Sequence, residues 1–243
     1  MPSQDELKQK AANRAAEFVE SGMVVGLGSG STSNFAIKRI AERIKSGELK
    51  NIVGIPSSAR TEKLATDLGI PLVGFDEKQQ IDITIDGADE VDPELNLIKG
   101  GGGALLREKV VAQASRKNII IVDDSKLSAH LGTKWALPVE VIPFASKTEA
   151  CFLESLGAAV SIRSRGDGGY FKTDQNNLIL DADFGLIKQP RELDETLASR
   201  AGIVEHGIFI SLTTDLIIAE QTGIRHLQKH NDHMVEIESK NFH

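Results

Sequence analysis

The stretch KGGGGALLREK, from Lys99 to Lys109, places an ammonium group, four consecutive glycines and a carboxylate close together. Glycine loses more backbone freedom on folding than any other residue, so four in a row suit either a flexible linker or a backbone that comes very close to a ligand. The run lies within a regular alternation of strand and helix patterns, which argues against a linker. We therefore expect a ligand to approach this backbone closely.

Glu108 follows the glycines on a predicted helix that covers residues 104–115. The residues three or four positions away on its helix face are all apolar: Ala104, Leu105, Val111 and Ala112. A carboxylate on such a face either pairs with a buried cation or is held partly desolvated, and desolvation raises its pKa toward the range of a general base. The position favours proton transfer as the role of Glu108.

The segment GLGSGST, Gly26–Thr32, joins a predicted strand to a predicted helix. Backbone amides at a helix N-terminus, with the helix dipole behind them, form an anion site. The dinucleotide motif would need a glycine at Ser31, and the phosphate loop of nucleotide hydrolases would need a lysine at Gly30. With both excluded, the loop and the hydroxyls of Ser29, Ser31 and Thr32 suit a single phosphate group. A tight strand-to-helix turn with a capping hydroxyl is equally compatible.

The segment DITIDGADEVD places Asp86 and Asp89 just beyond a strand that is predicted to be buried. Ligands of parallel sheets bind outside the carboxyl ends of the strands, which is where these acids fall. An acidic turn is the alternative, because Asp-Gly is a common turn pair. Asp86, Asp89, Glu90 and Asp92 are also oxygen ligands, but their spacing lacks the calcium-loop pattern and no histidine lies nearby, so we predict no metal site.

Lys99 stands immediately before the glycines. An ammonium group beside a closely held ligand stabilises negative charge that develops on an oxygen. A single lysine is also compatible with a solvated surface position. The catalytic interpretation gains support because Lys99, Glu108, the acid pair and the anion loop all fall at one edge of the predicted sheet.

Strand and helix patterns alternate through the first half of the chain. Strands are predicted at residues 23–28, 51–58, 70–75, 81–86 and 118–124, and helices at residues 33–47, 59–69 and 104–115. This alternation predicts an α/β fold in which a parallel sheet carries helices on both faces, as in a Rossmann-like domain.

The pattern changes after Trp135. Strands are predicted at residues 137–143, 158–164, 170–173, 178–181 and 203–211, with helices at residues 146–157 and 190–202. Apart from the extra short strand, the order approximates the β-α-β-β-α-β arrangement of ferredoxin-like domains. We therefore predict a smaller α+β domain at residues 137–206, inserted near the C-terminus of a Rossmann-like domain made of residues 1–136 and 207–243.

Composition limits the classes of protein to consider. The apolar fraction of 40% is ordinary for a globular protein, and the net charge of −7 argues against nucleic acid as the main partner. Cys151 is the single cysteine, which excludes an intrachain disulfide. The polar N-terminus begins with a capping box, Ser3-x-x-Glu6, and no segment has the length of a membrane span, so we expect a cytoplasmic protein.

Three histidines near the end of the chain, His226, His230 and His233, have helix-like spacing. They could be considered as a metal site. They belong to a polar stretch, however, and we predict a solvated tail there instead.

These motifs together resemble ribose-5-phosphate isomerase of type A. The resemblance runs from DELK near the N-terminus to about Ile218, and its segments are GLGSGST, DGADE, KGGGGALLREK and LPVEVIP. The family interconverts ribose 5-phosphate and ribulose 5-phosphate in the pentose phosphate pathway. The resemblance implies a small sugar-phosphate substrate, no cofactor, no nucleic-acid or membrane partner, and a homodimer.

The resemblance also implies roles for individual residues. The catalytic residues would be Glu108 as proton acceptor, Asp86 and Asp89 at the sugar, and Lys99 beside it. The substrate-binding residues would be Lys8, Ser29, Gly30, Ser31, Thr32, Asp86, Gly87, Ala88, Asp89, Lys99, Gly100, Gly101, Gly102 and Lys126. An isomerase of this kind opens the sugar ring and moves a proton between neighbouring carbons, and the glycines would let the backbone reach the sugar.

Two features depart from the family pattern. Ser29 stands where we expect threonine, a change that keeps the hydroxyl, and residues 213–227 and the tail after them diverge. The alternatives are a related sugar-phosphate enzyme, such as a deaminating isomerase or an acyl-CoA transferase, and a sugar-phosphate sensor that has lost the base. The retained Glu108 argues against a sensor.

Overall fold

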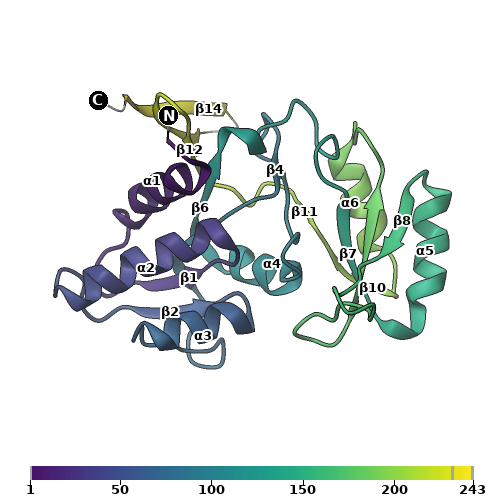
Figure 1. Cartoon of the computed structure of the whole chain (residues 1–243), viewed down its shortest axis with the longest axis horizontal. Helices are drawn as coiled ribbons and strands as arrows, with labels where there is room; N and C mark the ends of the chain where they lie inside the picture. Colours follow the sequence, from purple (N-terminus) through teal and green to yellow (C-terminus); the bar gives the residue numbers. More distant parts are fainter. Residues whose placement is uncertain (1, 231–232, 242–243) are drawn as a thin grey trace. The chain divides into compact units, whose positions relative to one another are not determined.

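The computed structural model describes residues 2–230 and 233–241 (Figure 1). The chain forms two compact units. The first comprises Met1–Gly87, Arg107–Ser125 and Leu212–His243, and the second comprises Ala88–Leu106 and Lys126–Ser211. Residues 137–206 lie within the second unit, which also takes in the glycine run.

In the described part of the chain, a seven-stranded sheet forms the centre of the first unit. Its spatial order is β14 (His233–Asn241), β13 (Gly223–His230), β12 (Asp215–Ala219), β6 (Ser115–Asp123), β3 (Ile81–Asp86), β1 (Val24–Leu27) and β2 (Val53–Pro56). The strands from β12 to β2 are parallel, whereas β13 and β14 are antiparallel. The expected Rossmann-like sheet is confirmed, with an antiparallel extension on one side.

Helices cover both faces of this sheet. They are α1 (Gln4–Ala16), α2 (Ser31–Lys45), α3 (Ala59–Asp67) and α4 (Leu105–Gln113). The first three share a buried core with Val25 and Ile83 of the sheet. Gly26 faces the other way, because neighbouring strand residues alternate sides, and a Cβ there would lie 2.9 Å from Val111 Cγ1 of α4. The fourth helix therefore covers the opposite face.

The second unit contains the ferredoxin-like arrangement that the sequence predicts. Its elements in chain order are β7 (Leu137–Val141), α5 (Ser146–Ser155), β8 (Ala159–Ile162), β9 (Leu178–Asp183), α6 (Pro190–Ala198) and β10 (Ile203–His206). The strands form an antiparallel sheet in the order β10-β7-β9-β8. Leu153 of α5 and Leu197 of α6 are fully buried in one core with the sheet residues Val139 and Leu180.

A separate small antiparallel sheet in the second unit carries Lys99. It consists of β4 (Glu90–Val91), β5 (Leu97–Ile98) and β11 (Ile208–Phe209). The predicted strand 203–211 is interrupted at Gly207, where a Cβ would lie 2.3 Å from the carbonyl oxygen of Lys99. The Lys99 amide donates to the Gly207 carbonyl at 2.9 Å, which fixes the start of the glycine run.

Two predicted strands do not form. Residues 70–75 contribute only a bridge between Leu72 and Gly54, because Pro71 has no N–H to donate and Gly74 ends the run. Residues 170–173 contribute only a bridge through Tyr170. The Thr173 hydroxyl donates to Glu140 at 2.8 Å and accepts from the backbone of the following turn, so the chain turns there instead of continuing as a strand.

The prediction of a solvated C-terminal tail is wrong. The described residues there form the hairpin strands β13 and β14, which pair with each other and with β12. His226 is fully buried, and its Nε2 lies 2.9 Å from Asp215 Oδ1 of β12. His230 and His233 are partners in the hairpin register rather than members of a helix, so the helix-like spacing seen in the sequence does not occur there. No helix within residues 2–230 and 233–241 is long and apolar enough to cross a membrane.

Candidate active site

The loop between β1 and α2 has the backbone geometry of an anion site. The helix begins at Ser31 with Gly30 as its N-cap residue, and no side chain caps it. Gly30 has a φ of 99°, a left-handed conformation that favours glycine. The first turn of α2 contains no acidic side chain, so its amides and the positive end of the helix dipole are suited to an anion.

Gly26 and Gly28 allow this loop to lie directly against β3. A Cβ at Gly28 would stand 2.2 Å from Asp86 Oδ1, and one at Gly26 would stand 1.8 Å from Thr84 Oγ1. Both separations are far below van der Waals contact. Side chains at these positions would push the loop away from Asp86.

The three hydroxyl residues of the loop have different surroundings. Ser31 is exposed and Thr32 is half-buried at the start of α2, where a ligand can reach them. The Ser29 hydroxyl lies instead within a cluster of hydroxyl oxygens: Ser57 Oγ at 2.8 Å, Ser58 Oγ at 2.8 Å and Thr61 Oγ1 at 3.1 Å. Ser29 thus ties the loop to the start of α3.

Asp86 ends β3 and is only 3% exposed. Three donors converge on its Oδ1: the Ser29 amide at 3.0 Å, the Ser33 hydroxyl at 2.9 Å and the Gly87 amide at 2.8 Å. Ser33 escaped the sequence analysis, although it lies on the buried face of α2 with Ala36, Ile37 and Ile40. A serine on the apolar face of a helix was the signal that could have identified it.

Glu108 lies in the first turn of α4 and is 5% exposed. The apolar face predicted around it is confirmed, since all four neighbours are buried: Ala104, Leu105, Val111 and Ala112. The end of α4 lies at the amino end of β3, where the Ile81 amide donates to the Ala114 carbonyl at 2.9 Å. The first turn of α4 therefore points toward the carboxyl end of the sheet, the end that carries Asp86. Lys109 beside it is also buried.

Lys8 is the remaining predicted site residue of the first unit. It lies on α1 and is half-buried, and its ammonium group is 3.5 Å from Asp5 Oδ1. The Asp5 side chain is 78% exposed, so this contact is easily exchanged for water.

In the second unit, Asp89 binds the glycine run. Its Oδ2 accepts the Gly101 amide at 2.7 Å, and its own amide donates to the Ile98 carbonyl. Lys99 is 4% exposed, which rules out the solvated surface position, and its Nζ lies 5.6 Å from the centroid of the Phe209 ring.

The glycine run forms a tight turn in which the Gly103 amide donates to the Gly100 carbonyl at 2.9 Å. Gly100 and Gly103 have φ values of 99° and 80°, which favour glycine. A Cβ at Gly101 would lie 2.8 Å from Asp89 Oδ1, and one at Gly103 would lie 2.4 Å from Phe171 Cζ. Packing and turn geometry thus explain three of the glycines, while Gly102 is exposed and can present its backbone to a ligand.

Two further predicted residues belong to the second unit. Ala88 is half-buried, just after Gly87. Lys126 closes a short 3₁₀ helix, η1 (Asp124–Lys126), and its half-buried side chain places Nζ 5.4 Å from the centroid of the Trp135 ring.

The acids after Asp86 bind different protein groups. Glu90 accepts the Gly132 amide at 2.9 Å and the Thr133 hydroxyl at 2.8 Å. Asp92 accepts from Asn96, and burial raises the pKa of Asp92 even though these hydrogen bonds oppose the shift. Within the described residues, no group of three or more histidine, cysteine or acidic side chains is arranged to hold a metal ion.

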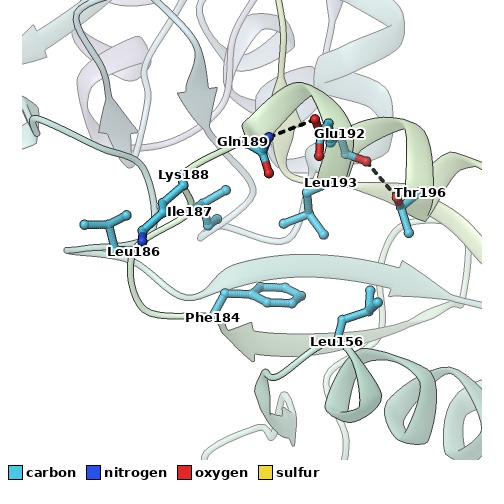
Figure 2. A pocket seen from close by; sticks show the side chains of 9 residues that line it. All are labelled: Leu156, Phe184, Leu186, Ile187, Lys188, Gln189, Glu192, Leu193 and Thr196. Carbon is cyan, nitrogen blue, oxygen red and sulfur yellow. Dashed lines mark hydrogen bonds between the residues drawn. The ribbon is translucent and has the colours of Figure 1, made fainter.

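A pocket elsewhere in the second unit contains none of these residues (Figure 2). It has a volume of about 370 Å³, and its lining includes the apolar side chains of Leu156, Phe184 and Leu193. Among the residues that line it, Gln189 donates to Glu192 at 2.9 Å.

The chain is similar to known proteins of one family. A family model described as ribose 5-phosphate isomerase A (phosphoriboisomerase A) matches residues 53–223. The ribose-5-phosphate isomerase A of Desulfatibacillum aliphaticivorans is 63% identical, over 94% of this chain and 99% of its own. That of Chloroflexus aurantiacus is 56% identical, over 90% of this chain and 92% of its own.

Solved structures extend the comparison to the fold. A D-ribose-5-phosphate isomerase in complex with phospho-erythronic acid superimposes with a TM-score of 0.92 at 38% identity, over 94% of this chain and all of that chain. The ribose 5-phosphate isomerase of Plasmodium falciparum gives a TM-score of 0.90 at 42% identity, over 93% of this chain and 99% of that chain. The chain belongs to the ribose 5-phosphate isomerase A family.

Proposed function

We propose that this protein interconverts D-ribose 5-phosphate and D-ribulose 5-phosphate through an enediolate. The proposal rests mainly on the burial and position of Glu108. It is a carboxylate that is 5% exposed on an apolar helix face, in the same unit as Asp86 and the anion loop. The proteins that this chain resembles along nearly its whole length bear the name of this enzyme.

The reaction begins with ring opening, in which O4 gains a proton and the hydroxyl on C1 loses one. We assign this acid-base step to Asp86, with help from Asp89. Glu108 then removes the proton from C2 of the open aldose, and the electron pair moves through C1 to O1 to give the enediolate. Return of the proton to C1, with transfer of the hydroxyl proton from O2 to O1, gives the ketose.

The enediolate carries negative charge that needs hydrogen-bond donors or cations. We assign this role to Lys99 and to the backbone amides of Gly100–Gly102, on the family resemblance. Preorganised donors of this kind stabilise a charge that develops in the transition state, because they do not have to reorient when it appears. This chemistry requires no cofactor.

The phosphate group would bind at the start of α2. The hydroxyls of Ser31 and Thr32 and the uncapped amides of the first turn would supply donors. The family resemblance adds Lys8 and Lys126 as sources of positive charge. Ser29 stabilises this loop through the hydrogen bonds of its hydroxyl group with Ser57 and Ser58.

A coupled assay tests the proposal directly. Purified protein is mixed with ribose 5-phosphate, and ribulose 5-phosphate is detected by a second enzyme that acts only on the ketose. We expect turnover, and its absence in folded protein would overturn the proposal. Release of ammonia from an amino-sugar phosphate, or transfer of coenzyme A between acids, would support the alternative enzymes instead.

We further propose that the enzyme is a cytoplasmic homodimer of the non-oxidative pentose phosphate pathway. The family resemblance supports the dimer and the pathway. Light scattering on the purified protein should give twice the mass of one chain, and a monomeric mass at assay concentrations would contradict the dimer.

A further inference from the structure

Arg163 is a partly buried cation that the mechanism above does not use. It directly follows β8 in the second unit, and its side chain is 16% exposed. Asp181 of β9 holds it in a two-point pair: Arg163 Nε donates to Oδ2 at 2.9 Å, and Nη2 donates to Oδ1. Paired hydrogen bonds of this kind fix the plane of a guanidinium group.

The remaining terminal nitrogen of Arg163 binds the glycine turn. Arg163 Nη1 donates to the Gly100 carbonyl at 2.9 Å and to the Gly101 carbonyl at 3.0 Å. The Gly100 oxygen also accepts the Gly103 amide, which closes the turn. One guanidinium group therefore connects the first two carbonyls of the turn to a carboxylate in the ferredoxin-like sheet.

These two hydrogen bonds determine where the neighbouring amides point. A peptide unit is planar, so fixing the Gly100 oxygen fixes the Gly101 N–H, and fixing the Gly101 oxygen fixes the Gly102 N–H. The Gly101 N–H donates to Asp89 Oδ2 at 2.7 Å, and Gly102 is exposed. A cation on a carbonyl oxygen also polarises its peptide group and strengthens the N–H at the other end as a donor.

Glycines need such a restraint more than other residues do. With no side chains, Gly100–Gly103 have a broad choice of backbone angles, and a turn of four glycines is held only by what contacts it. We propose that Arg163, oriented by Asp181, is a positioning residue that sets the direction and donor strength of the amides in this turn and, through Gly101, the position of Asp89. The proposal rests on the isomerase function, because those amides and Asp89 are assigned to the sugar there.

The test uses three substitutions and one matched control. Arg163→Met removes the charge and the donors, Arg163→Lys keeps the charge but loses the planar fork, and Asp181→Asn keeps Arg163 but removes the charged partner. Arg165→Met is the control, because Arg165 lies two residues away with a side chain that is 62% exposed and a salt bridge to exposed Asp167.

We expect Arg163→Met to lower kcat by about 10- to 100-fold, since a small misplacement of groups that act on the reacting atoms has effects of this size. Asp181→Asn should lower kcat by less, Arg163→Lys should recover part of the loss, and Arg165→Met should stay within about twofold of wild type. Inhibition by inorganic phosphate should not change in any variant, because Arg163 binds Asp181 and the glycine turn rather than the residues assigned to the phosphate. A merely structural role would reduce the active fraction without this separation of kcat from phosphate binding.

Amide hydrogen exchange supplies a readout that does not depend on activity. The Gly101 and Gly102 amides should exchange faster, and shift in the ¹H–¹⁵N spectrum, in Arg163→Met but not in Arg165→Met. An Arg163→Met enzyme with wild-type kcat and unchanged glycine amides would overturn the proposal, and if that variant does not fold, Asp181→Asn decides by the same two measurements. An inactive wild-type protein would refute the isomerase function alone, whereas the amide spectra would still decide whether Arg163 orders the turn.

Discussion

Two buried aspartates stand at opposite ends of the same sheet in the first unit. Asp86 ends β3, so it lies at the carboxyl edge, whereas Asp215 begins the parallel strand β12 and lies at the amino edge. Their exposures are nearly equal, at 3% and 1%. Burial alone therefore does not distinguish the carboxylate that we assign to ring opening from the one that we interpret as structural.

The donors around the two carboxylates do distinguish them. Asp86 is held by two backbone amides from the turns at the carboxyl edge and by the hydroxyl of Ser33 at the start of α2. Asp215 is held by His226 at 2.9 Å, the Thr214 hydroxyl at 2.7 Å and Lys117 at 3.2 Å. The partners of Asp215 thus include an ammonium group and an imidazole, and the imidazole belongs to β13 of the C-terminal hairpin. We therefore interpret this cluster as a structural contact that stabilises the hairpin against the rest of the sheet.

Glu108→Gln should have the largest effect at the carboxyl edge. Glutamine has nearly the same shape and still forms hydrogen bonds, but it cannot accept the substrate proton. A positioned acid-base group contributes about 10²–10⁴-fold, so kcat should fall by that factor while KM changes far less. Steady-state kinetics measures both, and Glu62→Gln on the exposed surface of α3 is the control. Near-normal turnover in folded Glu108→Gln would show that another residue is the base, and Asp86 would be tested next.

Asp86→Asn should reduce kcat by roughly 100-fold, because ring opening loses its acid-base group. Thermal stability should fall only slightly, since asparagine Oδ1 still accepts from Ser29 and Ser33. The comparison of the two edges would fail if Asp86→Asn lost stability and kept its activity.

Asp215→Asn should give the opposite result. Burial raises the pKa of Asp215, but the hydrogen bonds from His226 and Thr214 and the charge of Lys117 outweigh burial and hold that pKa below its ordinary value of 3.8. Breaking a buried charged pair costs about 3–5 kcal/mol of unfolding free energy, and kcat should not change. Exposed Asp67→Asn on α3 is the control.

The pH dependence of stability sharpens this prediction. A carboxylate with a lowered folded-state pKa stabilises the fold at pH values above its unfolded pKa, and this contribution disappears as the pH falls through the folded value. The difference in unfolding free energy between wild type and Asp215→Asn should therefore be full at neutral pH and shrink below about pH 3.8. Urea titrations at several pH values measure this difference in unfolding free energy. If the difference did not vary with pH over this range, the charge of Asp215 would not be what stabilises the hairpin.

The position of the anion loop and the burial of Glu108 could be predicted from the sequence because the signals there are local. The glycines of the loop, Gly28 and Gly30, and an acidic residue on the apolar face of a helix can each be recognised from the few residues around them. The ferredoxin-like order was predictable for the same reason, since each strand and helix has its own hydrophobic period.

The contacts that escaped prediction join distant residues. Arg163 binds carbonyls more than sixty positions away, and nothing in its neighbourhood distinguishes it from Arg165. The hairpin residues were predicted to form a polar tail because their own sequence is polar. Strands β13 and β14 are stabilised instead by pairing with β12 and by the buried contact between His226 and Asp215. Pairing of this kind depends on register across the sheet, which local composition does not encode.

Thr32→Val should produce a smaller effect at the carboxyl edge. The substitution removes one hydroxyl at the start of α2 while nearly keeping the shape of the side chain. A hydrogen bond to a charged group contributes about 1.5–3 kcal/mol, so KM for ribose 5-phosphate and the inhibition constant of inorganic phosphate should both rise about tenfold or more. Because the bond forms in the ground state and in the transition state alike, kcat should change less. Thr66→Val on the exposed side of α3 is the control, and unchanged phosphate affinity would move the phosphate away from this helix start.

Removal of divalent ions should have no effect on either edge. The acids after β3 each bind protein groups: Asp86 the loop donors, Asp89 the Gly101 amide, and Glu90 the segment around Gly132. A divalent ion would have to compete with these donors for the carboxylate oxygens, including the donors by which Asp86 holds the anion loop. Dialysis against a strong chelator should therefore leave kcat, KM and the melting temperature unchanged. If activity were lost and a divalent ion restored it, the acids at the carboxyl edge would bind a metal. The different hydrogen-bond donors around Asp86 and Asp215 would then no longer explain why only Asp86 is needed for activity.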